Sequence, residues 1–209
     1  MKKAMCITYE GEGNLYVNIT NRCTNNCDFC IRNNGDGAYG SDSLWLEREP
    51  SVEEILASVF SRDLGKYREL VFCGYGEPTE RLDVARECAL KIKEKSNIPI
   101  RINTNGHASL IAGKDVSPLF ADAFDTVSVS LNTPNAEKYV EMCHPVFKKD
   151  GFYGMLEFAK NVNLYVHNTV LSVVRETLTQ EELSECERLA EQIGVRLRVR
   201  TYVGKENGE

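Results

Sequence analysis

The chain has 209 residues, enough to bury a hydrophobic core and few enough to form one domain. Its composition is ordinary for a soluble globular protein, with 42% hydrophobic and 27% charged residues. Lys and Arg total 25 against 31 Asp and Glu, and the resulting formal net charge of -6 argues against a general nucleic-acid binder. The sequence holds no apolar run of the roughly 18 residues that a transmembrane helix needs. Its start, "MKKAMCITYEGEG", has no apolar core of a signal peptide, so we expect a cytoplasmic protein whose eight cysteines are reduced, buried or metal-bound.

The first predicted strand, residues 15–20, runs directly into a cluster of three cysteines. The spacing is Cys23-x-x-x-Cys27-x-x-Cys30, at the carboxyl end of a strand, where parallel α/β folds place their sites. Three thiolates suit an iron–sulfur cluster. A structural zinc ion instead needs four ligands. The candidates for a fourth ligand are Cys6, Cys73, Cys143 and His144.

The cysteines belong to a predicted loop of residues 21–50, whose part from 32 onwards has neither a helical nor a strand pattern. A loop this long in a compact domain is usually functional or mobile. It contains Trp45 and three glycines that would act as hinges. We expect it to be either a lid over the site or a strap packed on the sheet.

Three helix starts can be recognised further along the chain. Ser51 with Glu54 and Thr179 with Glu182 form capping boxes, in which a hydroxyl and a carboxylate satisfy each other's backbone donors. Thr133, before a proline, is predicted as a third N-cap with proline at the first helical position.

Five more predicted strands are rich in β-branched residues and bounded by turn residues: 69–74, 98–104, 125–132, 164–174 and 195–203. Strands separated by crossovers long enough for helices predict a parallel α/β sheet. We expect a single domain over residues 1–209, with its core elements between 14 and 203.

Side-chain alternation predicts the form of the sheet. In the strand 125–132, apolar residues occupy one face, while Ser128, Ser130 and Asn132 occupy the other. The first, third and sixth strands alternate in the same way. A doubly wound sheet has helices on both faces and strands that are apolar on both, and a closed eight-stranded barrel has a filled apolar lumen. The prediction is therefore a partial, TIM-like open barrel of six βα units with a polar inner face, and the alternative is an α/β sheet with one bare face.

These motifs resemble the radical S-adenosylmethionine (radical SAM) superfamily. The C-x-x-x-C-x-x-C spacing, with Phe29 before its last cysteine, resembles the family's cluster motif. "CGYGEP" at 73–78 resembles its glycine-glycine-glutamate motif, and "NTNG" at 103–106 resembles the motif that ends the third strand. "TVLSVVRE" at 169–176 resembles the fifth-strand pattern only loosely, because both of its glycines are replaced.

The resemblance implies that Cys23, Cys27 and Cys30 bind three irons of a [4Fe–4S] cluster and that the fourth iron binds S-adenosylmethionine. One electron would cleave the sulfonium and yield a 5′-deoxyadenosyl radical that abstracts a hydrogen atom from the substrate. The residues implied in binding S-adenosylmethionine are Phe29, Gly74, Gly76, Glu77, Asn103, Asn105, Ser130, Asn132 and Leu171.

Within that set the implied contacts differ. Phe29 and Leu171 would lie against the adenine, and Ser130 and Asn132 would hold the ribose or the carboxylate. The two glycines would let the backbone approach the methionine amino group, a contact that Glu77 would shape or join.

The stretches "NITNRCTNNCDFCIR" and "SLNTPNAEKYVEMCHP" most resemble radical SAM proteins associated with TatD-family metal-dependent hydrolases. This implies a TatD-family hydrolase as a partner, and an electron donor such as flavodoxin or ferredoxin. The alternative is a small enzyme like the 7-carboxy-7-deazaguanine synthases.

Arginines of the last strand supply a clue to the substrate. Arg196, Arg198 and Arg200 share one face, and arginine recognises carboxylate and phosphate groups through its rigid fork. Arg101 and His167 would add to this lining, so we expect an anionic substrate. The alternative is a set of ordinary edge-strand arginines paired with Asp or Glu.

Three interpretations remain open. The chain is a radical SAM enzyme, a zinc-stabilised non-catalytic domain that recruits Cys73 or Cys143, or a relative that binds a cluster without radical chemistry. Cys143 and His144 are either a hydrogen donor or extra ligand, or a buried thiol and a loop histidine.

Overall fold

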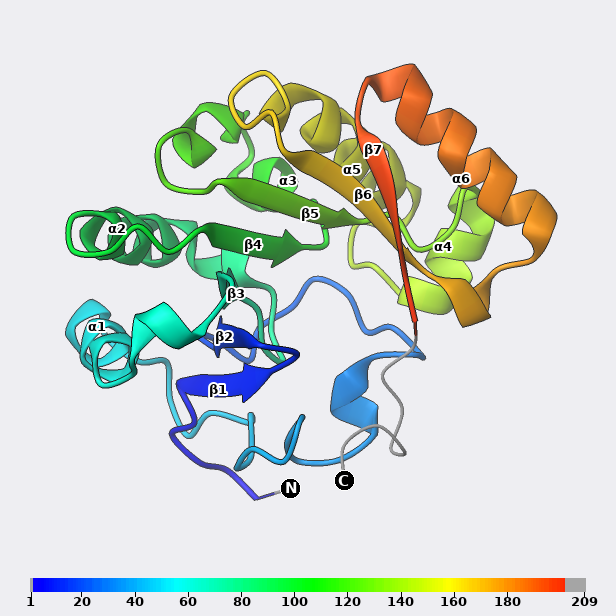
Figure 1. The fold of residues 1–209 in the computed structure, drawn as a ribbon. Coiled ribbons are helices and arrows are strands. Elements are labelled where there is room, and N and C mark those ends of the chain that lie inside the picture. The colour runs from blue at the N-terminus through cyan, green and yellow to red at the C-terminus, as the bar shows by residue number, and fades with distance from the viewer. Residues whose placement is uncertain (1, 202–209) are drawn as a thin grey trace.

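The computed structural model describes residues 2–201. Its strands form one seven-stranded sheet in the order β1-β2-β3-β4-β5-β6-β7 (Figure 1). The strands are β1 Thr8–Gly11, β2 Asn14–Val17, β3 Leu70–Phe72, β4 Ile100–Thr104, β5 Thr126–Ser130, β6 Thr169–Val174 and β7 Arg196–Arg200. The α-helices are α1 Val52–Phe60, α2 Leu82–Lys93, α3 Ala108–Ala112, α4 Ala136–Cys143, α5 Lys148–Val162 and α6 Gln180–Ile193.

The sheet is a partial, open barrel, as the sequence predicts. Each neighbouring pair from β2 to β7 is parallel, and helices connect these strands. Among the described strands, β1 and β7 end the order without pairing with each other. The predicted strand 164–174 is shorter, because the residues before Thr169 form a turn and a bend. Residues 202–203 of the last predicted strand lie outside the described residues.

The first strand of the sheet was not predicted. β1 pairs antiparallel with β2 through a two-residue turn of Glu12 and Gly13, whose φ angles are 50° and 73°. Two successive positive φ values give the turn that matches the twist of a hairpin, and glycine adopts such a φ without strain. The sheet therefore has one strand more than expected, and its first pair is not parallel.

The predicted helix starts hold at two of three positions. The capping boxes at Ser51 and Thr179 are both formed. The helix whose start was predicted at Thr133 is α4, and it begins two residues later than expected. Its N-cap is Asn135, whose side chain accepts the N–H of Lys138. Thr133 instead accepts the N–H of Asn135 at 3.4 Å and is not the cap.

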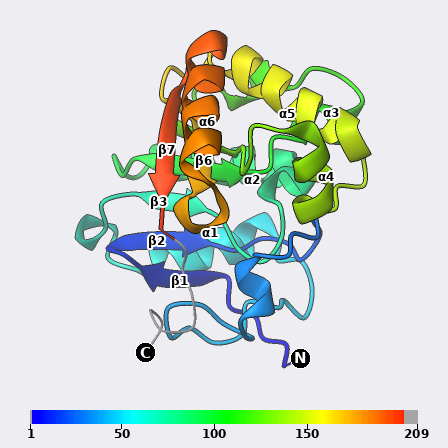
Figure 2. The same ribbon diagram turned by 90° about the vertical axis from the view of Figure 1, so that its right-hand side faces the viewer.

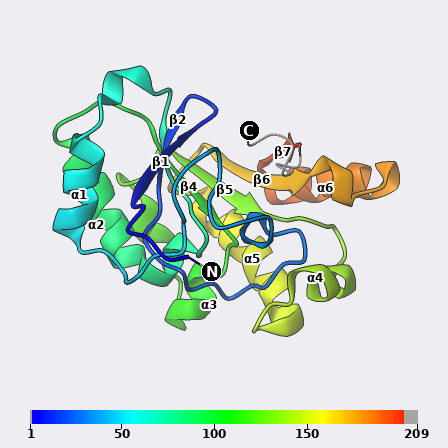
Figure 3. The ribbon, with the colours of Figure 1, turned by 90° about the horizontal axis from the view of Figure 1, so that it is seen from below.

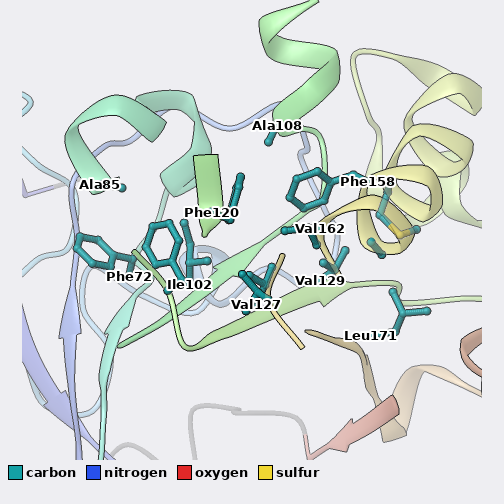
Figure 4. Close-up of a cluster of buried hydrophobic side chains, with 14 of the residues drawn as sticks. Phe72, Ala85, Ile102, Ala108, Phe120, Val127, Val129, Phe158, Val162 and Leu171 are labelled. Atoms are coloured by element: carbon teal, nitrogen blue, oxygen red, sulfur yellow. The ribbon is translucent and has the colours of Figure 1, made fainter. Parts of the chain in front are cut away.

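The helices lie on one face of the sheet, where they enclose the main hydrophobic core (Figures 2 and 3). Figure 4 shows part of this core, in which Phe72, Ile102, Val127 and Phe158 are essentially fully buried. Each such side chain contributes about 1.5–3 kcal/mol through its removal from water. None of the helices within residues 2–201 has both the length and the apolar character that a bilayer crossing requires.

The opposite, inner face has two parts. Over β4, β5 and β7 it carries polar residues at alternate positions, as predicted, whereas β6 contributes Ser172 between Val170 and Val174. Over β1 to β3 it carries a second apolar cluster, which corrects the prediction for the first strand. The buried members of this cluster are Tyr9, Tyr16, Ala38, Leu44, Val71 and Tyr75.

The long loop after the cysteines covers that second cluster as a strap. Asn18 Nδ2 donates to the carbonyl of Leu44 at 2.8 Å, and Tyr75 Oη donates to the carbonyl of Gly35 at 2.9 Å. The rings of Trp45 and Tyr75 pack edge to face at 5.2 Å. Of the two predicted alternatives, these contacts favour the packed strap over a lid.

Candidate functional site

The three clustered cysteines lie in the loop that leaves the carboxyl end of β2. Cys23, Cys27 and Cys30 are partly exposed free thiols. Phe29 between them is half-buried and packs against the main core. Because β2, β3, β4 and β5 run parallel, the segments after all four strands meet at this edge of the sheet.

The cysteine loop is attached to the end of α4 by main-chain hydrogen bonds. The N–H of Asn26 donates to the carbonyl of Cys143 at 2.9 Å, and that of Asp28 donates to Met142 at 3.0 Å. His144 Nε2 lies 2.8 Å from Asp28 Oδ1. His144 therefore contacts the cysteine loop through a carboxylate rather than through a thiol.

Cys143 is fully buried and lies against Cys27. It accepts a hydrogen bond from Asn132 Nδ2 at 3.5 Å. The hydrogen bond between the two thiols, followed by burial, raises the pKa of Cys27. A fourth sulfur thus stands beside one of the three predicted ligands.

Cys23 sits between two nitrogen donors. The N–H of Asn25 lies 3.4 Å from its sulfur, and Asn105 Nδ2 lies 3.9 Å away. Burial, with the charge of Glu77 second, raises the pKa of the Cys23 thiol to about 12. Both donors would stabilise this sulfur once a metal replaces its proton.

A buried histidine that the sequence analysis missed supports the same loop. His107 Nδ1 lies 2.8 Å from Thr24 Oγ1, and its Nε2 lies 3.1 Å from both the carbonyl of Gly151 and Tyr139 Oη. Burial lowers the pKa of His107 to about 4, so the ring is neutral near pH 7. The one signal in the sequence was its position directly after the third-strand motif.

The tautomer of His107 follows from its partners. Asn105 Nδ2 donates to Thr24 Oγ1 at 2.8 Å, so the Thr24 hydroxyl has its proton available for His107 Nδ1. The imidazole then carries its own proton on Nε2 and donates it to the carbonyl of Gly151. This arrangement ties the cysteine loop, the end of β4 and α5 into one network.

The two glycines after β3 allow close packing against the segment after β2. A Cβ on Gly74 would lie 2.1 Å from Asn18 Oδ1, and one on Gly76 would lie 2.3 Å from the carbonyl oxygen of Thr20. Any larger residue would push the "CGYGEP" turn away from the cysteine loop. The two glycines are therefore required by packing within the chain itself, independently of any ligand that the backbone contacts.

Glu77 uses both carboxylate oxygens within the protein. Its Oε1 accepts from the N–H and the hydroxyl of Thr79 at 3.0 and 2.7 Å, and its Oε2 accepts from the N–H of Asn105 at 2.7 Å. Burial raises the pKa of Glu77 in spite of these hydrogen bonds. Glu77 was expected either to shape the contact with the methionine amino group or to join it. Its hydrogen bonds within the protein favour the first of these roles.

Other residues predicted to hold S-adenosylmethionine lie near this edge. Asn103 and Ser130 lie on the inner face of β4 and β5. Asn132 has a left-handed φ of 65° and directs its amide nitrogen at Cys143. The side chain of Asn105 reaches the cysteine loop. Their contacts with a ligand stay a prediction.

Leu171 is not placed as predicted. Its side chain is fully buried on the helix side of the sheet, where its register neighbours Val129 and Leu197 also point (Figure 4). The alternate residues of β6, such as Ser172, face the inner side. Leu171 therefore packs the core and does not cover a ligand on the inner face, which corrects the prediction.

Two of the residues predicted to line the substrate site also need correction. His167 is exposed in the bend before β6, at the amino end of that strand and away from the cysteines. Arg101 is on the inner face but is 4% exposed and binds both oxygens of Glu69, at 3.0 and 2.7 Å. Arg101 is therefore an arginine paired with a carboxylate of the chain, and not a free group for the substrate. Arg198 and Arg200 have no such partner among residues 2–201.

The thiols of the cysteine loop suit an iron–sulfur cluster better than a single metal ion. Within residues 2–201, no three His, Cys, Asp or Glu side chains converge as the ligands of a single metal ion would. A [4Fe–4S] cluster distributes its cysteines over different irons, so three partly exposed thiols in one loop match it better than a closed zinc site. Three enclosed amide oxygens within residues 2–201 have no donor, and two of them, Asn18 Oδ1 and Asn25 Oδ1, lie next to the glycine turn and the cysteines. The residues present fit a cluster with a ligand bearing N–H groups beside it.

Comparison with known proteins gives a matching family. The model of the radical SAM superfamily matches residues 17–190. A GTP 3′,8-cyclase of Corynebacterium glutamicum is 30% identical over 150 residues, which cover 68% of this chain and 36% of that protein. A probable GTP 3′,8-cyclase of Methanosarcina acetivorans is 33% identical over 129 residues, 60% of this chain and 34% of that protein. The chain thus spans about a third of the length of the curated relatives it matches.

Solved structures with the same fold belong to larger proteins. A radical SAM methyltransferase from Sphaerobacter thermophilus superposes with a TM-score of 0.65 at 17% identity, over 92% of this chain and 57% of that one. Streptococcus suis SuiB bound to S-adenosylmethionine gives 0.64 at 16% identity, over 93% and 39%. At this identity the likeness concerns the fold.

Proposed function

Because this chain belongs to the radical SAM superfamily, we propose that it is an enzyme that cleaves S-adenosylmethionine reductively and abstracts a hydrogen atom from a substrate. The observation that carries the proposal is the set of three free thiols at the carboxyl end of β2, in a loop held against α4 and next to the glycine turn after β3. A bound [4Fe–4S] cluster supplies the electron that splits S-adenosylmethionine into methionine and the 5′-deoxyadenosyl radical.

The residues of the chain position these groups. Cys23, Cys27 and Cys30 would hold three irons. Glu77 and Gly76 keep the turn after β3 against the cysteine loop, so that the backbone there can meet the amino acid part of S-adenosylmethionine. The main core on one face of the sheet and the strap on the inner face of β1 to β3 fix the elements that carry these residues.

Anaerobic reconstitution with iron and sulfide tests this proposal. We expect a brown protein with about four irons per chain. Its reduced form should give an electron-paramagnetic-resonance signal that shifts on adding S-adenosylmethionine, and 5′-deoxyadenosine should be released. A colourless protein with one zinc per chain would contradict the proposal in favour of the zinc-stabilised domain.

A matched pair of cysteine variants sharpens the test. Cys27→Ala should lose the cluster signal and the release of 5′-deoxyadenosine, because it removes an iron ligand. Cys88→Ala replaces a buried thiol on α2, far from the loop, and should keep both. If both variants lose the cluster signal and the release of 5′-deoxyadenosine, the loss reflects a general destabilisation of the protein. If both variants keep them, Cys27 is not a ligand of the cluster.

We also propose the setting in which the enzyme works. The stretches around Cys23 and Cys143 support membership of the TatD-associated subgroup, with a TatD-family hydrolase as a partner. Thiols that are all free support a reducing, cytoplasmic setting with flavodoxin or ferredoxin as the electron donor. The matching relatives are named GTP 3′,8-cyclases, which favour the alternative of a 7-carboxy-7-deazaguanine synthase-like enzyme only weakly.

A further inference from the structure

The inner face of β7 carries arginines at three alternate positions, 196, 198 and 200. They differ in their partners. Arg196 Nη2 donates to Asn168 Oδ1 at 2.5 Å. Arg198 and Arg200 have no hydrogen bond or ion pair within residues 2–201, and the Nε of Arg200 is enclosed without an acceptor.

The register of the sheet shows what surrounds the two unpaired arginines. Ser130 of β5, Ser172 of β6 and Arg198 of β7 form one row across the inner face. Arg200 lies one row closer to the carboxyl edge, level with Val174. This places Arg198 beside Ser172 and both arginines on the same face as the predicted ligand site.

Within residues 2–201, no carboxylate forms an ion pair with Arg198 or Arg200. Arg101 already uses both oxygens of Glu69, so that carboxylate is engaged. Burial first, and then the nearby charges of Arg198 and Arg101, lower the pKa of Arg200, although the neighbouring Cys73 opposes the shift. The Nε of Arg200 is enclosed without an acceptor, and a buried donor without a hydrogen bond costs free energy that a bound anion would recover.

We propose that Arg198 and Arg200 form an anion subsite that binds a carboxylate or phosphate group of the substrate. The inference rests on the proposed function, because it places the substrate next to the cofactor edge of the inner face. Residues two apart on a strand have Cα atoms about 7 Å apart, so the two forks can bind one multiply charged group together. Ser172, the register neighbour of Arg198, adds a hydroxyl beside that fork.

Binding of simple anions to the reconstituted protein tests the subsite. Inorganic pyrophosphate and malonate represent the phosphate and the carboxylate class, and calorimetry measures their affinities. Arg200→Gln and Arg198→Gln should each weaken binding about tenfold or more, because each removes a charged fork from the site. Arg200→Lys, which keeps the charge, should recover part of the affinity.

Arg196→Gln is the matched control. It removes the same charge from the same strand and face, at the position whose side chain is already bound to Asn168, and should change the affinity less than about twofold. Preference of the wild type for one probe identifies the class of anion. If neither probe binds, or if all three glutamine variants bind alike, the subsite is overturned.

Release of 5′-deoxyadenosine without any anion separates this inference from the proposed function. Unchanged release in Arg198→Gln and Arg200→Gln, together with weaker anion binding, supports the subsite. If release falls in both variants while the iron content stays normal, the arginines hold S-adenosylmethionine, and the subsite is overturned while the proposed function stands. If the wild type binds the anion but never cleaves S-adenosylmethionine, the proposed function fails and the subsite stands.

Discussion

His107 connects three segments that are distant in the sequence. Its ring reaches Thr24 in the cysteine loop, Tyr139 on α4 and Gly151 on α5. A neutral imidazole can serve as acceptor at Nδ1 and as donor at Nε2, whereas a protonated ring could no longer accept from Thr24. The geometry of the cysteine loop therefore depends on the charge of one buried side chain.

Because of His107, the free energy of unfolding should decrease as the pH is lowered. Its pKa is lowered to about 4 in the folded protein by burial, against about 6.5 when unfolded. The stabilisation is fully present above pH 6.5 and is lost as the pH falls from 6.5 toward 4, because the unfolded chain takes up the proton first. The contribution is of the order of 3 kcal/mol. Urea unfolding at pH 7 and pH 5 measures the part lost over that interval, which is about 2 kcal/mol.

His107→Gln provides the comparison for that experiment. The variant cannot titrate, so its loss of stability between pH 7 and pH 5 should be smaller than that of the wild type, whatever its absolute stability. Reconstituted samples should also show a changed electron-paramagnetic-resonance signal, since the loop would lose its support. Parallel pH profiles in the two proteins would show that His107 does not carry the dependence.

Helix α4 is capped at its start and binds the cysteine loop at its end. Asn135 caps its start, and the carbonyl groups of Met142 and Cys143 at its other end hold the cysteine loop. The helix spans only the eight residues Ala136–Cys143, so fraying at the start reaches the loop within two turns. Its stability is thus linked to the geometry of the site.

Asn135→Ala should lower the free energy of unfolding by about 1 kcal/mol, because it leaves the N–H of Lys138 without its cap. Asn135 is exposed, so the substitution opens no cavity. Asn135→Asp retains an acceptor and favours the positive end of the helix dipole, so it should match or exceed the wild type. Urea titration compares the three proteins, and equal values for Ala and Asp would rule out capping by this side chain.

Sequence patterns predicted the elements better than their ends. Runs of β-branched residues between turn residues identified the strands from β2 to β7, and hydroxyl–carboxylate pairs identified α1 and α6, because these signals are local. β1 was missed because it is short and its turn, Glu12-Gly13, lacks the Asn or Asp typical of such hairpins. Thr133 was predicted as the N-cap because a proline follows it, but the side chain of Asn135 accepts the N–H of Lys138 and caps α4.

At the scale of the whole molecule, the site is formed by segments that follow several different strands. Contacts between segments that are distant in the sequence cannot be predicted from local patterns. Cys23, Cys27 and Cys30 were found because their spacing is itself the signal. The partners of Arg101 and His107 lie on other segments, so only the fold reveals them. Leu171 was assigned from a motif that departs from the family pattern, and its side of the sheet follows only from the register.

Removal of the cluster should affect the molecule locally. Treatment with chelator and oxidant should lower the melting temperature by about 5 °C or more, since a ligand bound only to the folded state stabilises it. Hydrogen exchange should speed up in residues 21–33 and at the end of α4, which share main-chain hydrogen bonds. It should stay slow in β5 and β6, which the main core covers. Uniform acceleration across the sheet would instead indicate that the cluster holds the whole fold.

The open form of the sheet has a consequence for association between molecules. Among the described strands β7 ends the sheet, and a free edge can pair with a strand of another chain. Three arginines at alternate positions would meet three more at a spacing of about 5 Å if two such edges paired antiparallel, and like charges at that distance repel. The side chains that we assign to the substrate would thereby also keep two half-closed barrels from joining through their β7 edges.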